Sequence, residues 1–308
     1  MSGPVQERDA ACENEALAGI QTREGRTTEV GGMPVARVLP TKGRRTVGAW
    51  CFVDLMGPAD AEEPDPMEVG PHPHIGLSTV TWLLEGEALH TDSLGTEQMI
   101  RPGQVNLMTA GHGIAHAELA AQPPFRGVQM WIAQPETTRH GASDFVHHED
   151  LPEVEQPGLR GLVFAGSLAG ASAPTRTDTP LVGADLTLDR GATSLATDVG
   201  FEHCVVPLDG RVKVGDEVLE PGWLGLIPAG IDELPIAATT DATRFLVLGG
   251  EPLGEKVSMW WNFVARDQDE ITAAYRAWQD RTDRFGDVPS SLERIEAPRP
   301  PWLPAEAR

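Results

Sequence analysis

The chain of 308 residues is long enough to form two domains of ordinary size, each with its own hydrophobic core. Apolar residues make up 40% of the sequence and charged residues 23%, and both fractions are ordinary for a folded globular protein. The 24 basic and 46 acidic residues give a formal net charge of −22. Because a field of that sign repels phosphate backbones and anionic lipids, direct binding to nucleic acid or to a membrane surface is disfavoured.

The three cysteines, Cys12, Cys51 and Cys204, form neither a Cys-x-x-Cys pair nor a disulfide framework. This cysteine usage fits a reducing compartment. The first residues lack the basic stretch and following apolar run of a signal peptide. No run approaches the roughly 20 apolar residues that span a bilayer. We therefore expect a cytoplasmic protein.

Turn residues divide the chain into five predicted regions. The 33 glycines and 26 prolines are spread along the sequence, which favours short strands and tight turns over a helical bundle. Apolar runs with turns at spacings of roughly 8–12 residues indicate a β-sandwich or barrel. We expect a mobile leader over residues 1–30, a first β-domain over 31–135, a polar linker over 136–158, a second β-domain over 159–262, and a helix with a Pro-rich tail over 263–308.

The last region contains the one predicted helix. Ile271, Tyr275 and Trp278 recur at helical spacing and predict a short helix over residues 269–278. The tail from Glu296 onward is rich in proline and is expected to be extended. The remainder of the chain is predicted to be all-β.

One internal repeat relates the two predicted β-domains. The segment LLEGEALHTDSLGTEQMIRPGQVNLMTAG, which begins at Leu83, resembles PLDGRVKVGDEVLEPGWLGLIPAG, which begins at Pro207. Both read as a strand, an acidic-Gly turn, a hairpin, a Pro-Gly turn and a last strand that ends in Ala-Gly. The hairpin is longer in the first copy, so the match has two offsets. The repeat predicts two similar β-units in tandem.

Two pairs of residues at i, i+2 spacing form the candidate site. His72 and His74 are separated by one residue, as are His116 and Glu118. In a strand, residues at this spacing point to the same face, so two neighbouring strands would direct four ligands toward one ion. Three imidazoles and one carboxylate suit Fe(II), Mn(II), Cu(II), Ni(II) or Zn(II), and the lack of a thiolate argues against a structural zinc site. A single His-x-His is usually a surface feature, but two such pairs beside Gly-rich turns predict a metal site.

The second copy of the repeat lacks these ligands. Under the two offsets, the four candidate ligands fall on Ala196, Asp198, Pro235 and Ala237. The turn residues persist in both copies, which indicates that the turns serve the fold and the ligands serve another purpose. We therefore expect the second β-unit to be free of metal.

The residues of the site also carry a resemblance to a known family. The stretches HPHIGLSTVTWLLEGEALHTDSLG from His72 and RPGQVNLMTAGHGIAHAE from Arg101 closely resemble pirins. The match continues in VQMWIAQP from Val128 and WNFVARDQDEI from Trp261, and it covers most of residues 33–280. The resemblance implies an all-β fold of two tandem cupin (jelly-roll) barrels, with Fe(II) in the N-terminal barrel alone.

The resemblance also implies a site and an oligomeric state. The iron ligands of pirins map onto His72, His74, His116 and Glu118 of this sequence. His112 stands where other pirins often have arginine, which makes the pocket rim less basic. From its place before Gly113, His112 would either guard the pocket entrance or simply occupy the turn. Pirins are commonly monomers.

Two functions of different classes follow. In the leading hypothesis the protein resembles a quercetin 2,3-dioxygenase that opens a small aromatic enol or flavonol with O₂, and Glu118 is both a ligand and the base that accepts the hydroxyl proton. In the alternative it is a regulatory protein that binds a transcription factor or a metabolic enzyme, with iron as a redox-sensitive switch. The acidic surface favours a basic protein partner over DNA.

Further polar residues have the parity of the ligand strands. His90 and Asp92 stand at i, i+2 in the hairpin between the ligand pairs. They would orient a ligand or simply form the turn at Asp92, and the turn is the simpler interpretation. Gln129 and Trp131 share the parity of a later strand, so both are expected to line the barrel interior, with Trp131 as a packing residue.

Overall fold

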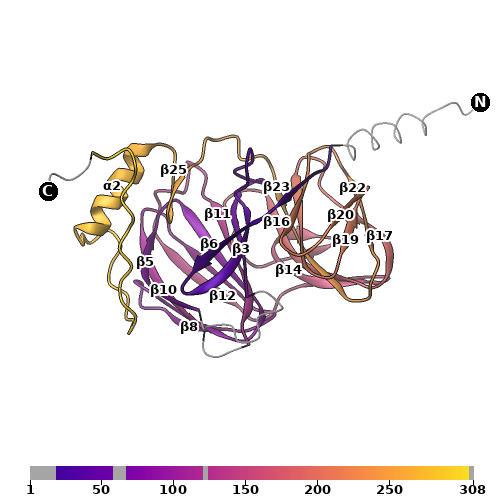
Figure 1. The fold of residues 1–308 in the computed structure, drawn as a ribbon, viewed down its shortest axis with the longest axis horizontal. Helices are drawn as coiled ribbons and strands as arrows, with labels where there is room; N and C mark the ends of the chain where they lie inside the picture. Colours follow the sequence, from indigo (N-terminus) through magenta and orange to yellow (C-terminus); the bar gives the residue numbers. More distant parts are fainter. Residues whose placement is uncertain (1–18, 58–66, 121–123, 305–308) are drawn as a thin grey trace, which may run out of the picture. The chain divides into compact units, whose positions relative to one another are not determined.

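The computed structural model describes residues 19–57, 67–120 and 124–304, which divide into two compact units rich in β-strand (Figure 1). The unit that we call the N-terminal barrel comprises the described parts of Thr27–Ala36, Phe52–Glu149 and Gly254–Arg308. The unit that we call the C-terminal barrel comprises the described parts of Met1–Arg26, Arg37–Cys51 and Asp150–Leu253.

The N-terminal barrel is built from a larger and a smaller sheet. The larger sheet has the order β12 (Asp144–His148), β9 (Val105–Thr109), β6 (Leu77–Glu85), β11 (Arg126–Ala133), β4 (Trp50–Met56), β3 (Met33–Leu39) and β2 (Arg26–Val30). The smaller sheet has the order β5 (Glu68–His74), β10 (Ile114–Ala120), β7 (Ala88–Asp92) and β8 (Glu97–Ile100). Strands β5 and β10, which carry the candidate ligands, lie next to each other, and both are almost entirely buried.

The C-terminal barrel repeats this plan. Its larger sheet has the order β1 (Gln21–Glu24), β21 (Trp223–Ile227), β18 (Glu202–Asp209), β23 (Thr243–Gly250), β16 (Leu181–Leu188), β14 (Leu159–Leu168) and β13 (Glu153–Gln156), and β15 (Ala171–Ser172) pairs with β14. Its smaller sheet has the order β17 (Gly191–Ala196), β22 (Glu233–Ala238), β19 (Val212–Val214) and β20 (Glu217–Leu219). Two further short strands near the C-terminus, β24 (Ser258–Trp260) and β25 (Phe263–Ala265), pair with each other. The predicted all-β fold of two similar units is confirmed.

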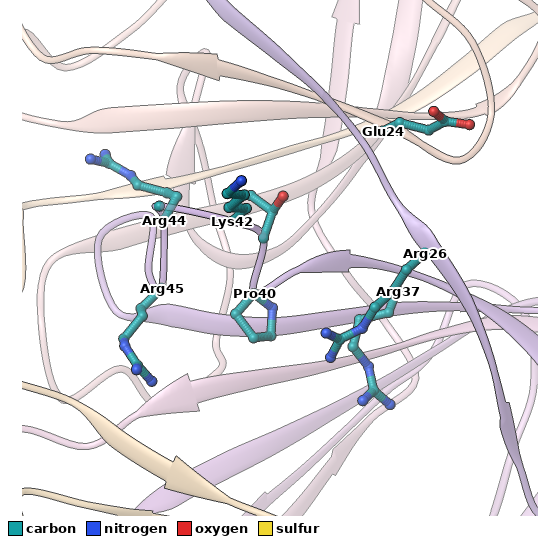
Figure 2. A pocket seen from close by; sticks show the side chains of 9 residues that line it. Glu24, Arg26, Arg37, Pro40, Lys42, Arg44 and Arg45 are labelled. Atoms are coloured by element: carbon teal, nitrogen blue, oxygen red, sulfur yellow. The ribbon is translucent and has the colours of Figure 1, made fainter.

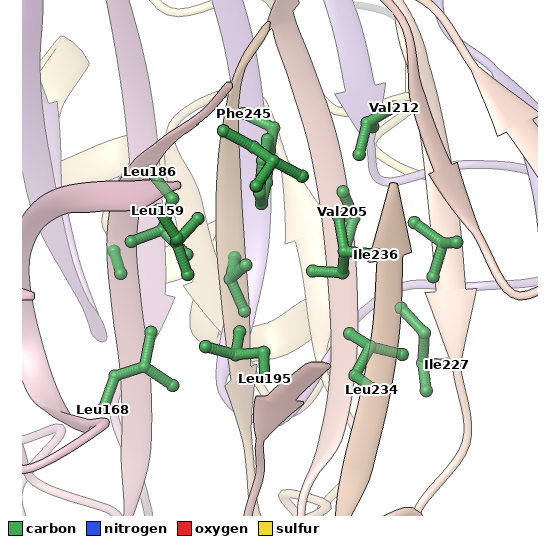
Figure 3. Close-up of a cluster of buried hydrophobic side chains, with 14 of the residues drawn as sticks. Leu159, Leu168, Leu186, Leu195, Val205, Val212, Ile227, Leu234, Ile236 and Phe245 are labelled. Atoms are coloured by element: carbon green, nitrogen blue, oxygen red, sulfur yellow. The ribbon is translucent and has the colours of Figure 1, made fainter. Parts of the chain in front are cut away.

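Apolar side chains fill the interior of the C-terminal barrel (Figure 3). Leu195, Val205 and Phe245, from three different strands, are completely buried. Burial of each such side chain contributes about 1.5–3 kcal/mol to folding. The core of this barrel is therefore a hydrophobic one.

The strand register shows what stands at the ligand positions of the second unit. In the N-terminal barrel His116 lies opposite His72, and at the corresponding place in the C-terminal barrel Pro235 lies opposite Ser194. Ser194 precedes the position that the repeat predicts, Ala196, because the connection after β17 is longer than the connection after β5. Ser194 and Ala196 therefore stand at the places of His72 and His74, instead of the predicted Ala196 and Asp198, and neither carries an imidazole or a carboxylate.

One α-helix, α2 (Gln268–Gln279), lies near the C-terminus and confirms the predicted helix. Its N-cap is Asp267, whose carboxylate accepts a hydrogen bond of 2.9 Å from the backbone N–H of Glu270. Its buried residues are Ile271, Ala274 and Trp278. Among the described residues, no helix combines the length and the apolar character that crossing a lipid bilayer requires.

The helix packs behind the ligand strands. Its buried face belongs to one apolar cluster with Ile75, Ala115 and Phe263. Ile75 directly follows His74, and Ala115 directly precedes His116, so alternation along a strand points these apolar side chains away from the ligand face. A parallel β-bridge between Ile75 and Phe263 ties the C-terminal segment to the same strands. These contacts explain why residues after 253 join the N-terminal barrel.

The structure differs from the expected boundaries at two connections. Residues 21–30, expected in a mobile leader, form β1 and β2 because β1 adds to the edge of the C-terminal barrel beside β21. Residues 144–156, expected in the linker, contain β12 and β13, and Phe145 of β12 packs on a small apolar cluster of the N-terminal barrel. The start of the expected leader, with Cys12, lies outside the described residues. Cys51 and Cys204 are buried.

His203 of β18 makes the stability of the C-terminal barrel depend on pH. Burial lowers the pKa of His203 to about 4, whereas a histidine in an unfolded chain titrates near 6.5. The unfolded state therefore binds a proton more readily in this interval, and the stabilisation present above pH 6.5 is lost as the pH falls toward 4. When the pH falls, the free energy of unfolding should decrease by up to about 3 kcal/mol less in His203→Gln than in the wild type. Urea unfolding at pH 7 and pH 4.5 measures this decrease, and an equal decrease in both proteins would contradict the role of His203.

Candidate metal centre

The geometry of β5 and β10 brings three imidazoles together. His116 lies directly opposite His72 in the register, and His74 lies opposite Ile114, two positions along. The ring centroids of His72 and His116 are 4.3 Å apart, and each of these rings lies 5.0 Å from the ring of His74. All three side chains are buried. The histidines that the i, i+2 spacing selected therefore converge on one point inside the barrel.

Hydrogen bonds fix the tautomers of these rings. The Nδ1 atoms of His72 and His74 lie 2.9 Å and 3.1 Å from the carbonyl oxygens of Gly70 and Asn262. A carbonyl oxygen only accepts, so both Nδ1 atoms carry the proton and donate it. The Nε2 atoms are left with free lone pairs, which is the form of histidine that binds a metal.

The Nε2 atoms of His74 and His116 lie 3.1 Å apart. Two nitrogens bound to one ion at about 2.1 Å and at right angles would lie about 3.0 Å apart. Without a proton or a cation between them, two such lone pairs repel each other in a buried site. The donor set therefore fits a divalent transition metal, which would remove this repulsion.

Burial keeps the three rings neutral. It lowers the pKa of His72 to about 4 and lowers the pKa values of His74 and His116 well below the usual range. The neighbouring imidazoles lower the pKa values of His74 and His116 further, because two adjacent rings resist carrying charge together. At neutral pH the rings are ready to act as ligands and need not lose a proton first.

Glu118 is buried beside this cluster. The register of β10 against β5 shifts between His116 and Glu118, because the two steps between them face three steps of β5, so the extra residue of this bulge lies in β5. Against β7 the register of β10 is regular, and Glu118 lies opposite His90. The Oε1 atom of Glu118 accepts a hydrogen bond of 3.0 Å from the hydroxyl of Thr81. Burial raises the pKa of Glu118, so its carboxyl holds a proton more readily than an exposed glutamate does.

The ligand atoms form two groups that share His116. The atoms of His72, His74 and His116 all lie within 4.8 Å of one another, and so do those of His90, His116 and Glu118. The structure thus brings together the three predicted histidines and links Glu118 to them through His116. It also adds His90, for which the sequence left open a role in orienting a ligand or a place beside the turn at Asp92.

His90 connects the site to Asp92. The Nε2 atom of His90 lies 3.2 Å from Oδ2 of Asp92, and its Nδ1 atom lies 3.3 Å from Nδ1 of His116. Burial by itself raises the pKa of Asp92, but hydrogen bonds from His90 and Thr96 outweigh it and lower the pKa. An ionised Asp92 accepts the Nε2 proton of His90, so Nδ1 of His90 accepts the proton of His116. The Nε2 lone pair of His116 then points to the other two histidines.

Asp92 also serves the turn that the sequence predicts. Its Oδ1 atom accepts hydrogen bonds of 2.8 Å and 3.1 Å from the backbone N–H groups of Leu94 and Thr96. The ring of His90 stacks on Phe145, with centroids 4.6 Å apart. Both interpretations of this pair therefore apply, because one carboxylate holds the turn and orients His90.

A row of polar side chains crosses the larger sheet opposite Glu118. Asn106 and Gln129 pair with Thr81 on its two sides, so the three side chains share the face of the sheet that meets Glu118. The Oε1 atom of Gln129 and the Nδ2 atom of Asn106 are buried without a hydrogen-bond partner. Sequence reasoning missed Thr81 and Asn106, although each lies between two apolar residues of a strand.

Aromatic packing closes one side of the site. Trp131 stacks on Phe52, with centroids 3.9 Å apart, and meets the ring of His74 edge-on at 5.2 Å. Trp131 thus has the packing role that was expected of it. His112, by contrast, lines a separate cavity of about 210 Å³ with Arg139, His140 and Arg284 among others.

These features define a two-barrel cupin protein with a buried histidine cluster, and comparison with known proteins names the family. Residues 32–132 match the family model of pirin, and residues 183–286 match that of the pirin C-terminal cupin domain. The chain is 46% identical to a Pseudomonas aeruginosa protein named "Putative quercetin 2,3-dioxygenase", over 96% of this chain and 94% of that protein. The chain belongs to the pirin family.

Two other proteins extend this likeness. A "Pirin-like protein" of Caulobacter vibrioides is 35% identical, over 83% of this chain and 91% of that protein. A crystal structure of quercetin 2,3-dioxygenase from Acinetobacter baumannii is 40% identical and superposes with a TM-score of 0.87, over 96% of this chain and 99% of that one. The similarity to this crystal structure therefore extends over both barrels.

Asp92→Asn tests the role of the hydrogen-bond chain. The amide keeps an acceptor for the turn but can present N–H to His90, which would reverse the proton order up to His116. We expect Co(II) affinity to fall by about 10- to 100-fold while the melting temperature changes little. Competition with a chelator measures the affinity. Glu97→Gln, an exposed change on the same hairpin, serves as the control, and equal affinities in all three proteins would contradict the role.

Proposed function

We propose that the protein is a metal-dependent dioxygenase of the quercetin 2,3-dioxygenase type, with Fe(II) held by His72, His74, His116 and Glu118. The observation that carries the proposal is the convergence of neutral imidazoles whose Nδ1 protons are already committed elsewhere. The names of the relatives at 46% and 40% identity support the substrate class, a flavonol or a related aromatic enol.

The charge of the site suits an acidic enol. A divalent ion with one carboxylate ligand leaves a formal charge of about +1, which favours binding of a deprotonated hydroxyl oxygen. When bound, iron supplies Lewis acidity and one-electron redox capacity. The chain itself must then orient the substrate, take up its proton and exclude water.

Glu118 is the proposed base. Burial raises its pKa, which brings the carboxylate closer to the range in which a general base works at neutral pH. Thr81 donates to Oε1, which holds the carboxylate in place. Oε2 is the atom that we assign to the hydroxyl proton of the substrate. The proton moves to Glu118 as the substrate becomes the electron-rich enolate that reacts with O₂.

Gln129 and Asn106 would orient the substrate. A buried acceptor and a buried donor without partners cost free energy unless a bound group satisfies them. Oε1 of Gln129 can accept from a substrate hydroxyl, and Nδ2 of Asn106 can donate to a substrate carbonyl. A flavonol carries both groups.

The C-terminal barrel is proposed to hold no metal. Ser194, Ala196, Pro235 and Ala237 occupy the ligand positions of its smaller sheet, and none of them is a ligand for a transition metal. Its contribution would then be structural or concern another ligand.

Oxygen uptake with quercetin tests the proposed function. After anaerobic loading with Fe(II), the wild type should consume O₂, and His116→Ala and Glu118→Gln should lower the rate by about 100-fold or more. His140→Ala, an exposed histidine of the same barrel, should leave the rate unchanged. Tight iron binding without any O₂ uptake would contradict the dioxygenase proposal and favour the iron-dependent binding protein.

Gln129→Leu tests the orientation of the substrate. Loss of the acceptor should lower kcat/KM for quercetin by about tenfold or more, because the substrate hydroxyl loses a buried hydrogen bond. Fe(II) affinity should not change, and the melting temperature should hold or rise since an unpaired polar atom is removed from the interior. Steady-state kinetics and thermal unfolding measure both, and an unchanged kcat/KM would rule out this role.

A further inference from the structure

A basic cavity is lined by residues that all belong to the C-terminal barrel unit, which includes the start of β2 and the end of β3, in a protein whose net charge is −22 (Figure 2). The cavity has a volume of about 840 Å³. Its basic lining residues are Arg26, Arg37, Lys42, Arg44 and Arg45. Glu24 is the one carboxylate among the described lining residues, so the lining carries a formal charge of +4.

The chain holds these cations in fixed places. Arg26 begins β2, and Arg37 lies on the neighbouring strand β3. The other cations belong to a tight turn in which the backbone N–H and carbonyl groups of Thr41 and Arg44 bond each other at 3.0 Å. Gly43 lies in this turn at a φ of 82°, a conformation that favours glycine.

Several of these cations have N–H donors without a hydrogen-bond partner among the described residues. Arg44 forms an ion pair with Glu202, whose other carboxylate oxygen accepts a hydrogen bond of 2.7 Å from Gly48. The Nε atom of Arg44 is nevertheless buried without a hydrogen-bond partner. Within the described part of the chain, Arg26, Lys42 and Arg45 form no side-chain hydrogen bond or ion pair. The cluster thus combines mutual repulsion with unused donors, and a bound anion would relieve both.

We propose that this cavity binds a small polyanion with two or more phosphate or carboxylate groups. Arginine binds both groups through paired hydrogen bonds, and the volume lies in the range of small-molecule sites. Carboxylates farther away than about 8 Å are screened at physiological ionic strength, so the local charge decides. A nucleic acid would extend beyond the cavity over a protein whose net charge is −22, which favours a small ligand.

Isothermal titration of the full chain with pyrophosphate and, separately, with citrate tests the proposal at constant ionic strength. The two anions distinguish a phosphate ligand from a carboxylate ligand. Arg26→Gln and Arg45→Gln each remove one exposed cation of the cavity. Arg160→Gln and Arg211→Gln remove exposed arginines of the same unit that pair with Asp189 and Glu220, and they serve as controls for net charge.

We expect one of the anions to bind at one molecule per chain. Each cavity variant should weaken binding by about tenfold, the effect of one lost charge-assisted hydrogen bond, and each control should change it by less than about twofold. Absence of binding by both anions would overturn the proposal. Equal weakening of anion binding in the cavity variants and the control variants would also overturn it. The same holds if a polyglutamate peptide binds when neither small anion does.

Discussion

Three buried imidazoles in the N-terminal barrel each turn the Nδ1 atom toward a partner from a different part of the chain. Gly70 lies on the same strand as His72, His90 lies on β7, and Asn262 comes from the C-terminal segment. These partners leave the Nε2 lone pairs of all three rings facing one point, which is unfavourable in a buried site without a cation. The proposed metal, its substrate and its chemistry all depend on this arrangement.

The C-terminal segment therefore serves the site as well as the fold. Asn262 supplies the carbonyl that fixes His74, and α2 packs through one apolar cluster against residues next to the ligands. On the other side of the ligand strands, Thr81 holds Glu118, and Asn106 and Gln129 leave polar atoms unsatisfied. Rigid packing behind the ligands and spare polar groups in front of them suit a site in which a substrate is positioned against fixed ligands.

Much of this site follows from strand periodicity. Residues at i, i+2 share a face, so the sequence places His72 with His74 and His116 with Glu118, and the repeat predicts the second unit. Periodicity gives no information on contacts between distant segments, so Asn262, 188 residues from His74, could not be found. The packing of Phe145 could not be predicted for the same reason, since a short edge strand in a polar stretch has the sequence pattern of a linker. Nor does the pattern reveal the bulge in β5, or the pairing of β10 with β7 that places His90 opposite Glu118.

The most direct test is a crystal structure of the Fe(II)-loaded protein with anomalous diffraction recorded at the iron edge. We predict a single iron peak per chain, in contact with Nε2 of His72, His74 and His116 and with the carboxylate of Glu118. A peak at another place, or contact through an Nδ1 atom, would contradict the arrangement of protons on which the account rests.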